Sequence, residues 1–206
     1  PKNGIIHRII TKPDESPCKA KVRRILPGSP KAVKGLQAIQ DLERLGVIER
    51  VKPGDPVTWS SPVHFTVKPD GSLRCVGDYR LLNDKTILDH YPLPNLKSFT
   101  GEIAGSVIFS KLDMTKAFHQ ILLDPRDRNK TCITTPWGLF NFRRLSMGMK
   151  NSAQSFQRLV EHVLRGVPDV FVYIDDILVF SKDEESHKKT VEEVMKRLDA
   201  NGLTLA

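Results

Sequence analysis

One stretch of the chain, DVFVYIDDILVFS at residues 169–181, restricts the possible folds more than any other. Two apolar runs, residues 170–174 and 177–180, flank two aspartates, and this spacing predicts a tight β-hairpin with Asp175 and Asp176 at its tip. Adjacent carboxylates between hydrophobic strands repel each other and lose hydration, which destabilises them unless a cation binds. A divalent cation is the simplest partner, and an exposed turn without a ligand is the alternative.

A third carboxylate belongs to Asp113, which ends a predicted buried strand at residues 107–112 and precedes a helix-like segment at residues 115–121. If this strand and the hairpin are neighbours in one sheet, three carboxylates converge. Clusters of carboxylate oxygens suit Mg²⁺ or Mn²⁺, and two such ions about 3.5–4 Å apart can serve in-line phosphoryl transfer. The alternative role for Asp113 is a helix N-cap.

Local signals predict three clear helices. The first begins after Ser29, its N-cap, and ends at Gly46. The second begins at Ser152, its cap, and the third begins with a capping box of Ser181 and Glu184. The apolar positions expected to face the core are Val33, Leu36, Ile39, Leu42 and Leu45 in the first helix and Val191, Val194, Met195 and Leu198 in the third.

Two further hairpins are predicted around Gly-containing turns. One joins residues 63–68 to 73–79, and the other joins residues 131–135 to 139–145. Short strands mixed with helices and hairpins indicate the α+β fold class.

The net charge of +8 is concentrated near the beginning of the chain. Up to residue 34, only Asp14 and Glu15 oppose nine basic residues. A basic arm on a nearly neutral body suits a polyanion such as nucleic acid, and a solvated arm that keeps the protein soluble explains the charge equally well. The basic residues are Lys2, Arg8, Lys12, Lys19, Lys21, Arg23, Arg24, Lys31 and Lys34.

Composition excludes several classes of protein. Cys18, Cys75 and Cys132 are widely spaced, which argues against a disulfide framework and for a reducing compartment. No apolar run approaches the roughly 20 residues of a membrane span, and the first residues do not form a signal peptide. Because the first residue is not Met, we expect a piece of a larger polypeptide.

Four motifs, in order, resemble those of reverse transcriptases in the form found in Gypsy-type LTR retrotransposons. YIDDILVFS, residues 173–181, resembles the Tyr-x-Asp-Asp motif, and LDMTKAFHQI, residues 112–121, resembles the first palm motif. PDGSLRCVGDYRLLN, residues 69–83, resembles the fingers motif. FRRLSMGMKNSAQSFQR, residues 142–158, is similar to the family segment that ends in Phe-Gln, and HRI, residues 7–9, also fits.

The resemblance implies a right-hand polymerase fold of the α+β class, with an antiparallel palm sheet packed on helices. The fingers would comprise residues 1–82 and 115–145, and the palm residues 83–114 and 146–206. The thumb, connection and ribonuclease H domains would lie outside this chain. Without a thumb, the chain alone is expected to be weakly active or inactive.

The implied activity is that of an RNA-directed DNA polymerase, which transfers deoxynucleotides from dNTPs to a primer 3′-hydroxyl on an RNA or DNA template. The family implies two Mg²⁺ ions, with Mn²⁺ as an alternative. The implied partners are primer-template, dNTPs and the rest of a pol polyprotein, with its protease, ribonuclease H and integrase. No membrane partner is expected, and a dimer is left open. The family also implies cytoplasmic virus-like particles and later nuclear delivery of the cDNA.

The resemblance assigns the metal and the nucleotide sites residue by residue. Asp113, Asp175 and Asp176 match the catalytic, metal-binding aspartates, and the main-chain carbonyl of Met114 matches a further metal contact. The ring of Phe118 would pack under the sugar and exclude a 2′-hydroxyl. The other dNTP-binding positions would be Lys68, Arg74, Thr115, Ala117 and Met147, and the primer and template would meet Tyr173 and Gly148.

Five of the nucleotide, primer and template positions also have a structural alternative. Arg74 and Lys68 read as ordinary surface charges of a hairpin, and Phe118 reads as a core aromatic. Gly148 is compatible with a plain turn, and Tyr173 with an aromatic packed in a sheet.

The chain departs from the family pattern at four positions. Gly77 stands where Val is usual and is expected to loosen its strand by about 0.5–1 kcal/mol. Ser146, Ser152 and Ala153 replace the usual Pro, Ala and Pro. Two other functions compete with a polymerase: a non-catalytic remnant that binds nucleic acid, and a two-metal nuclease, which shares the carboxylates but does not explain the arginine or the motif order.

Overall fold

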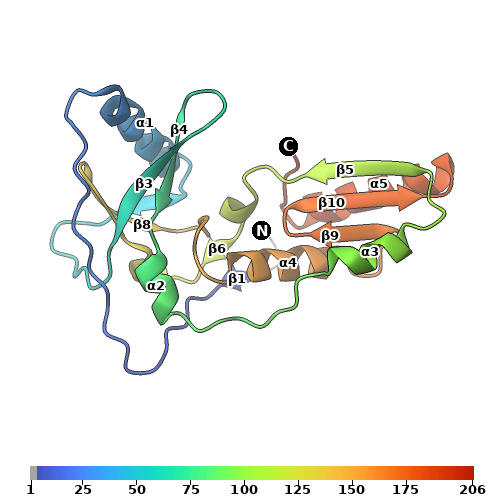
Figure 1. Cartoon of the computed structure of the whole chain (residues 1–206), viewed down its shortest axis with the longest axis horizontal. Helices are drawn as coiled ribbons and strands as arrows, with labels where there is room; N and C mark the ends of the chain where they lie inside the picture. The colour runs from blue at the N-terminus through green and yellow to red at the C-terminus, as the bar shows by residue number, and fades with distance from the viewer. Residues whose placement is uncertain (1–3) are drawn as a thin grey trace. The chain divides into compact units, whose positions relative to one another are not determined.

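The computed structural model of the chain describes residues 4–206, apart from the side chains of residues 96–98. The chain forms two compact units, whose elements are labelled in Figure 1. The first unit comprises Asp89–Ile121, Ala153–Ala206 and the described start of the chain as far as Ile5, and the second comprises Ile6–Leu88 and Leu122–Ser152.

The first unit is built on a three-stranded antiparallel sheet in the order β5 (Ile108–Asp113), β10 (Asp176–Ser181), β9 (Val170–Tyr173). The predicted hairpin of β9 and β10 is confirmed, but the placement of both aspartates at its tip is wrong. The two turn residues are Ile174 and Asp175, and Asp176 is already the first residue of β10.

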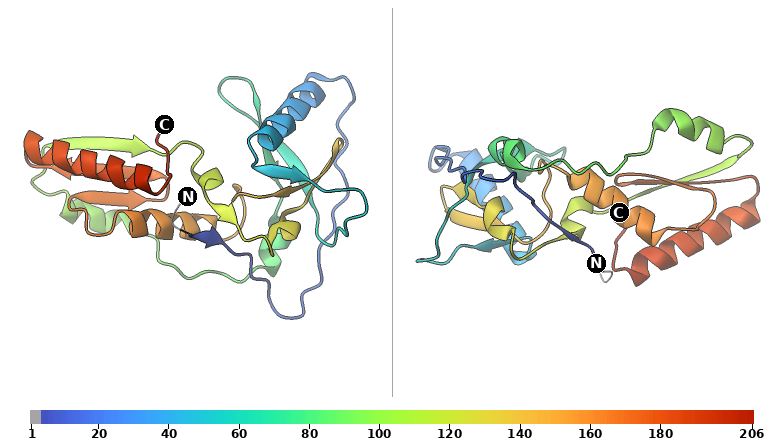
Figure 2. Two further views of the ribbon diagram at one scale, coloured as in Figure 1. Left: turned by 180° about the vertical axis from the view of Figure 1, so that it is seen from behind. Right: turned by 90° about the horizontal axis from the view of Figure 1, so that it is seen from below.

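Three helices accompany this sheet: α3 (Leu96–Glu102), α4 (Ser152–Val163) and α5 (Glu184–Ala200). Figure 2 shows α5 lying over one face of the sheet, with its axis roughly along the strands. The imidazole of His187 in α5 is hydrogen-bonded to Ser110 Oγ in β5, at 2.8 Å, and to Ser181 Oγ in β10, at 3.1 Å. One buried side chain therefore fastens the helix to two strands.

The predicted caps of two helices are wrong. The N-cap of α5 is Asp183, whose carboxylate accepts from the Ser186 amide at 2.8 Å, whereas Ser181 belongs to β10. Ser152 is the first residue of α4, and its hydroxyl donates to the Met149 carbonyl at 2.8 Å. In the last helix, Met195 is half exposed rather than part of the core.

The second unit contains a five-stranded mixed sheet, in which β3 runs parallel to β7 and the other neighbours are antiparallel. Both predicted hairpins, β3–β4 and β7–β8, are confirmed. The strands, in sheet order, are β2 (Ile48–Arg50), β8 (Gly138–Phe142), β7 (Ile133–Thr135), β3 (Ser61–Val67) and β4 (Leu73–Gly77).

Two helices flank this sheet. α1 (Pro30–Arg44) begins as predicted, with Ser29 Oγ accepting from the Ala32 amide at 3.2 Å. Its predicted apolar stripe is too wide, because Val33 is exposed and Leu45 is half exposed. α2 (Arg80–Lys85) was not predicted, since six residues do not display a helical period.

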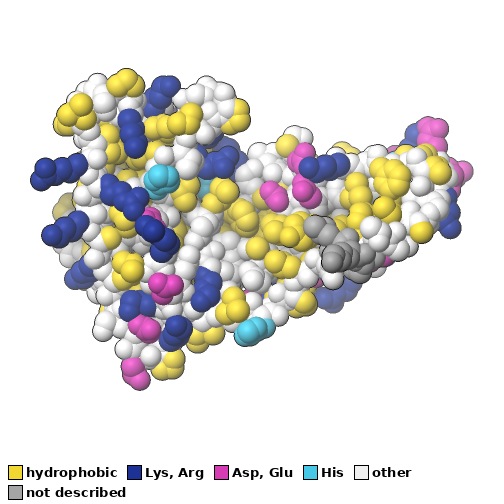
Figure 3. Space-filling model, viewed as in Figure 1, with side chains coloured by type: hydrophobic (Ala, Val, Ile, Leu, Met, Phe, Trp, Pro, Cys, Tyr) yellow, Lys and Arg dark blue, Asp and Glu magenta, His cyan; other side chains and the backbone are white. Residues whose placement is uncertain are grey.

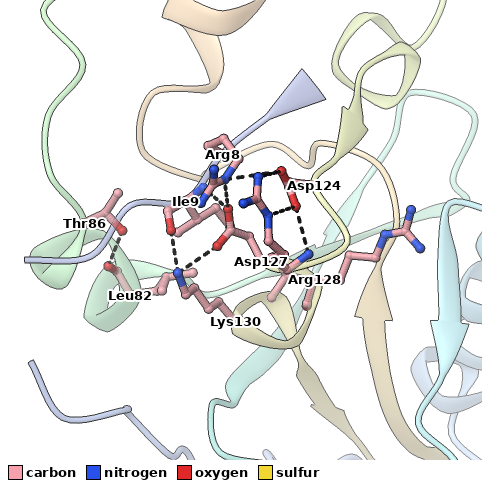
Figure 4. A network of polar contacts seen from close by, with 10 residues as sticks. Arg8, Ile9, Leu82, Thr86, Asp124, Asp127, Arg128 and Lys130 are labelled. Carbon is pink, nitrogen blue, oxygen red and sulfur yellow. Dashed lines mark hydrogen bonds and ion pairs between the residues drawn. The ribbon is translucent and has the colours of Figure 1, made fainter. Parts of the chain in front are cut away.

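Residues 6–9 are held within the second unit by strand pairing and by a network of polar contacts (Figure 4). β1 (Ile6–His7) pairs in parallel with β6 (Leu122–Leu123), and the short helix η2 (Arg128–Thr131) follows. The buried carboxylate of Asp127 accepts from Arg8 Nε at 2.7 Å and from Lys130 Nζ at 2.8 Å. The HRI segment therefore acts locally as a structural anchor.

The rest of the basic arm is mostly exposed, and Figure 3 shows Lys and Arg side chains gathered over the second unit. Arg23 is paired with Asp78, whereas Lys19 and Lys21 are exposed. The arm's first cation, Lys2, lies outside the described residues. In the described part of the chain, no helix has both the length and the hydropathy that a membrane span requires.

Candidate active site

Two of the three aspartates that were predicted to bind metal meet at the end of the three-stranded sheet. Asp113 and Asp176 are directly opposite each other in the β5–β10 register, so their side chains lie on the same face. The ammonium of Lys111, two residues before Asp113, lies 3.2 Å from Asp113 Oδ1 and 3.1 Å from Asp176 Oδ1. Figure 3 shows acidic side chains beside a basic one over this end of β5 and β10. The two carboxylates thus converge on one cation.

The third aspartate is placed differently. Asp175 is exposed in the turn before β10. Within residues 4–206, no three His, Cys, Asp or Glu side chains are grouped closely enough to hold a metal ion. The structure therefore brings Asp113 and Asp176 together without drawing Asp175 into the same cluster.

The residues after Asp113 pair with the end of the chain. Met114 is buried and forms an antiparallel bridge with Leu205. Thr115 donates its amide to the Thr204 carbonyl at 3.0 Å and its hydroxyl to the Leu205 carbonyl at 2.8 Å. Both polar donors of Thr115 are therefore engaged within the protein.

The predicted helical segment at residues 115–121 is only a short 3₁₀ helix, η1 (Ala117–Gln120), which follows a left-handed Lys116 with φ 45°. Ala117 is buried. The ring of Phe118 meets Phe156 of α4 edge to face, with the ring centroids 5.8 Å apart. Packing against α4 therefore restrains the aromatic ring that the resemblance assigns to the sugar.

Tyr173, predicted to lie near the primer, is the last residue of β9 and is paired with Asp176. Because directly opposed residues share a face, Tyr173, Asp176 and Asp113 lie on one side of the sheet.

Two predicted nucleotide contacts meet in the second unit. Arg74 Nη1 in β4 lies 3.6 Å from Met147 Sδ, and both side chains are exposed. Lys68 follows β3, whose Thr66 is paired with Arg74. Since alternate residues of a strand share a face, Lys68 extends from the same side of the hairpin as Arg74.

The loop after Met147 is fixed by Asn83, a residue to which sequence reasoning gave no role. Gly148 has φ 83°, and its carbonyl accepts from Asn83 Nδ2 at 2.8 Å. The amide of Lys150 donates to Asn83 Oδ1, also at 2.8 Å. The side-chain amide of Asn83 therefore holds the loop at Gly148 and at Lys150, on both sides of Met149.

Sequence reasoning also missed Lys111 and Gln157. Lys111 is two residues from Asp113, and the alternation of side chains along a strand was the signal that could have placed both on one face. Gln157 belongs to the segment that resembles the family's Phe-Gln motif, but no local pattern indicates what its amide binds.

Comparison with known proteins gives a consistent result. Residues 66–206 match the family described as reverse transcriptase (RNA-dependent DNA polymerase). The Retrovirus-related Pol polyprotein from transposon 297 of Drosophila melanogaster is 35% identical over 171 residues, which are 79% of this chain and 16% of that polyprotein. The corresponding protein from transposon gypsy is 38% identical over 131 residues, 62% of this chain and 13% of the relative. The chain thus spans less than a fifth of these relatives.

Among solved structures, the Prototype Foamy Virus Protease-Reverse Transcriptase superposes with a TM-score of 0.86 at 28% identity, covering 99% of this chain and 26% of the viral chain. The foamy viral protease-reverse transcriptase in complex with RNA/DNA hybrid superposes with a TM-score of 0.80 at 24% identity, covering 97% of this chain and 26% of that chain, a likeness of fold alone. Because the family match includes more than half of its residues, the chain belongs to the reverse transcriptase (RNA-dependent DNA polymerase) family of LTR retrotransposons.

Proposed function

We propose that the chain is the part of an LTR-retrotransposon Pol polyprotein that carries out template-directed nucleotidyl transfer. The primer 3′-hydroxyl attacks the α-phosphate of a dNTP, a new P–O bond forms, and pyrophosphate leaves. The observation that carries the proposal is the opposition of Asp113 and Asp176 on adjacent strands, with both carboxylates directed at one cation. The repulsion between the two negative charges would disfavour that arrangement if no cation were near.

The donor set at this sheet end suits a hard divalent cation. Asp113 and Asp176 already share the Lys111 ammonium, which occupies the place where a metal cation would bind. In this proposal Asp175, which is exposed in the adjoining turn and stands apart from this pair, would turn toward a bound ion and supply a third carboxylate. Oxygen ligands of this kind favour Mg²⁺ or Mn²⁺, and such ions, when bound, neutralise negative charge in phosphoryl transfer. We propose Mg²⁺ as the physiological ion.

The second unit supplies cations for the triphosphate. Arg74 offers a planar guanidinium that binds phosphate oxygens in a bidentate manner, and Lys68 offers a point charge on the same side of the hairpin. The thioether of Met147 contacts the Arg74 guanidinium at 3.6 Å and limits its freedom. In this proposal the second unit corresponds to the fingers and the first to the palm of a right-hand polymerase.

Phe118 sets the choice of sugar in this proposal. Its ring is held edge to face against Phe156 and cannot yield to a larger sugar without disturbing α4. A variant with Phe118→Ala is therefore expected to incorporate ribonucleotides more readily than the wild type, in competition with dNTPs.

Primer extension on an RNA template tests the proposal. The polypeptide that contains this chain is assayed with Mg²⁺ or Mn²⁺ beside the double variant Asp175→Asn/Asp176→Asn. Synthesis that depends on the metal and disappears in the variant is the expected result. If the wild type binds primer-template but does not extend it with either ion, the function is nucleic-acid binding without catalysis.

A further inference from the structure

The turn that precedes Asp176, the first residue of β10, has an unfavourable backbone conformation. Ile174 has φ 55°, in the left-handed region that β-branched side chains avoid. Such a conformation is energetically unfavourable and persists only when neighbouring groups hold it. Ile174 is directly followed by Asp175 and Asp176, so whatever holds Ile174 also orients these carboxylates.

A buried glutamine contacts this turn from α4. The side chain of Gln157 is fully buried, and its Oε1 accepts from the Ile174 amide at 2.6 Å. Its Nε2 donates to the Val172 carbonyl at 2.9 Å. A side-chain amide has both a donor and an acceptor, and this site uses both on one strand end. An apolar residue of equal size would leave the Ile174 amide and the Val172 carbonyl without these partners.

The orientation of this amide is itself fixed. Gln157 Nε2 also donates to Glu161 Oε1 at 2.7 Å, and Glu161 accepts a second hydrogen bond from the Tyr91 hydroxyl. The guanidinium of Arg158 lies over the Tyr91 ring, 4.5 Å from its centroid, and pairs with Asp89 at 2.7 Å. Because an ionised carboxylate accepts hydrogen bonds and cannot donate them, Glu161 faces the amide nitrogen of Gln157, and the amide oxygen therefore faces Ile174.

The position of the turn decides which side of the sheet the acidic residues occupy. With Ile174 and Asp175 in the loop, Tyr173 is opposite Asp176, and Asp176 is opposite Asp113. A slip of one residue along the strand would send Asp176 to the other face.

We propose that Gln157 is a positioning residue for the metal-binding carboxylates: it holds Ile174 in the left-handed conformation and so keeps Asp176 opposite Asp113. The inference rests on the proposed function, because it concerns the placement of the same carboxylates. Gln157 does not touch the nucleotide or the metal in this role.

The test compares Gln157→Met, which keeps the length and removes both polar atoms, with Val163→Ala, a buried control in the same helix. Both variants are expected to lose stability. Mn²⁺ affinity, measured by electron paramagnetic resonance on the polypeptide that contains this chain, should fall about tenfold in Gln157→Met, which corresponds to the strain released by one residue. It should remain unchanged in Val163→Ala.

A second variant separates positioning from general damage. Glycine adopts positive φ freely, so Ile174→Gly keeps the turn conformation and removes the strain that Gln157 offsets. The loss of Mn²⁺ affinity caused by Gln157→Met should therefore be smaller when Ile174→Gly is also present. An equal loss in both backgrounds would overturn the proposal.

Amide hydrogen exchange gives a readout that does not depend on the metal. Gln157→Met should accelerate exchange at Ile174 well beyond any change in Val163→Ala. If exchange accelerates while the wild type binds no Mn²⁺, the proposed function fails and the structural part of this inference stands. If wild-type binding depends on Asp176 but Gln157→Met alters neither affinity nor exchange, the positioning role alone is wrong.

Discussion

Asp113 and Asp176 face each other directly across the β5–β10 pair, although like charges in that arrangement repel. The ammonium of Lys111 reduces this repulsion by lying close to both carboxylates. In return, the hydrogen bonds to Asp176 and Asp113 raise the pKa of the Lys111 ammonium. The side chain is more than half exposed, so salt screens its attraction to the two carboxylates.

Replacing Lys111 by Met tests whether this ammonium competes with a divalent ion. A bound ion must displace the ammonium, so Lys111→Met should bind Mn²⁺ more tightly, by about two- to tenfold at low salt, with a smaller gain at high salt. Calorimetric titration measures the affinity. Lys188→Met, which removes an exposed cation paired with Glu184 on α5, is the matched control for net charge. Equal gains in both variants would mean that only the total charge matters.

Gly77 fits the chain for a reason that the sequence comparison did not reveal. A Cβ atom at Gly77 would lie 2.4 Å from the Tyr79 ring. Tyr79 is almost completely buried, and its hydroxyl donates to the Thr131 carbonyl at 2.9 Å. Glycine is expected to loosen the strand, but it also leaves room for the Tyr79 ring, which occupies the space that a side chain at position 77 would fill.

Restoring the usual family residue should consequently destabilise this chain. We expect Gly77→Val to lower the free energy of unfolding by about 1–3 kcal/mol, measured by urea denaturation, because Tyr79 must leave its site. The loss should shrink in a Tyr79→Leu background. Gly101→Ala is the control, since nothing lies within 4 Å of a Cβ atom there, and it should be neutral or mildly stabilising. An unchanged stability in Gly77→Val would refute the packing argument.

The β9–β10 hairpin could be predicted because its two apolar runs are long enough to be recognised. The turn residues could not, since Asp tolerates positive φ better than Ile and the pattern therefore favoured the aspartates. Ile174 occupies the turn because Gln157, 17 residues earlier, supplies the partner for its amide. That contact is tertiary, and no local rule contains it.

The same competition explains the misplaced cap. Ser181 and Glu184 satisfied the capping-box pattern, but Ser181 is drawn into β10 and bonds His187. Asp183, next to the helix start, then caps α5. Local patterns thus located the three hairpins, the three longest helices and the carboxylates, while the exact ends of these elements were decided by neighbours distant in sequence.

Asn83 should control the order of the loop that carries Met147. Asn83→Ala removes hydrogen bonds to the Gly148 carbonyl and the Lys150 amide. We expect a loss of about 1–2 kcal/mol in stability and faster amide exchange across the loop. Hydrogen-exchange mass spectrometry measures the second effect. Gln37→Ala, an exposed change on α1, should alter neither quantity, and equal exchange in Asn83→Ala and wild type would exclude the clamp.

The network that anchors the beginning of the chain should make stability depend on pH. Burial raises the pKa of Asp127, but hydrogen bonds from Lys130, Arg8 and the Ile9 amide outweigh it and hold the pKa below the ordinary value. The Arg126 guanidinium likewise lowers the pKa of Asp124. Because the pKa of each carboxyl is lower in the folded protein, the unfolded chain binds more protons as the pH falls. The stabilisation is therefore fully present above the pKa of the carboxyl in the unfolded chain, and it is lost as the pH falls through the pKa of the carboxyl in the folded protein.

Asp127→Asn should therefore destabilise the protein most near neutral pH. We expect a loss of about 1.5–3 kcal/mol there, the range for hydrogen bonds to a charged group. The difference between the two proteins in the free energy of unfolding should narrow as the pH falls below about 4, because the wild-type carboxyl begins to be protonated in the unfolded chain there. Urea denaturation across this range measures the gap. Asp55→Asn, in an exposed loop, should show no such narrowing, and a gap that stays constant in Asp127→Asn would mean that the network acts through shape and not through charge.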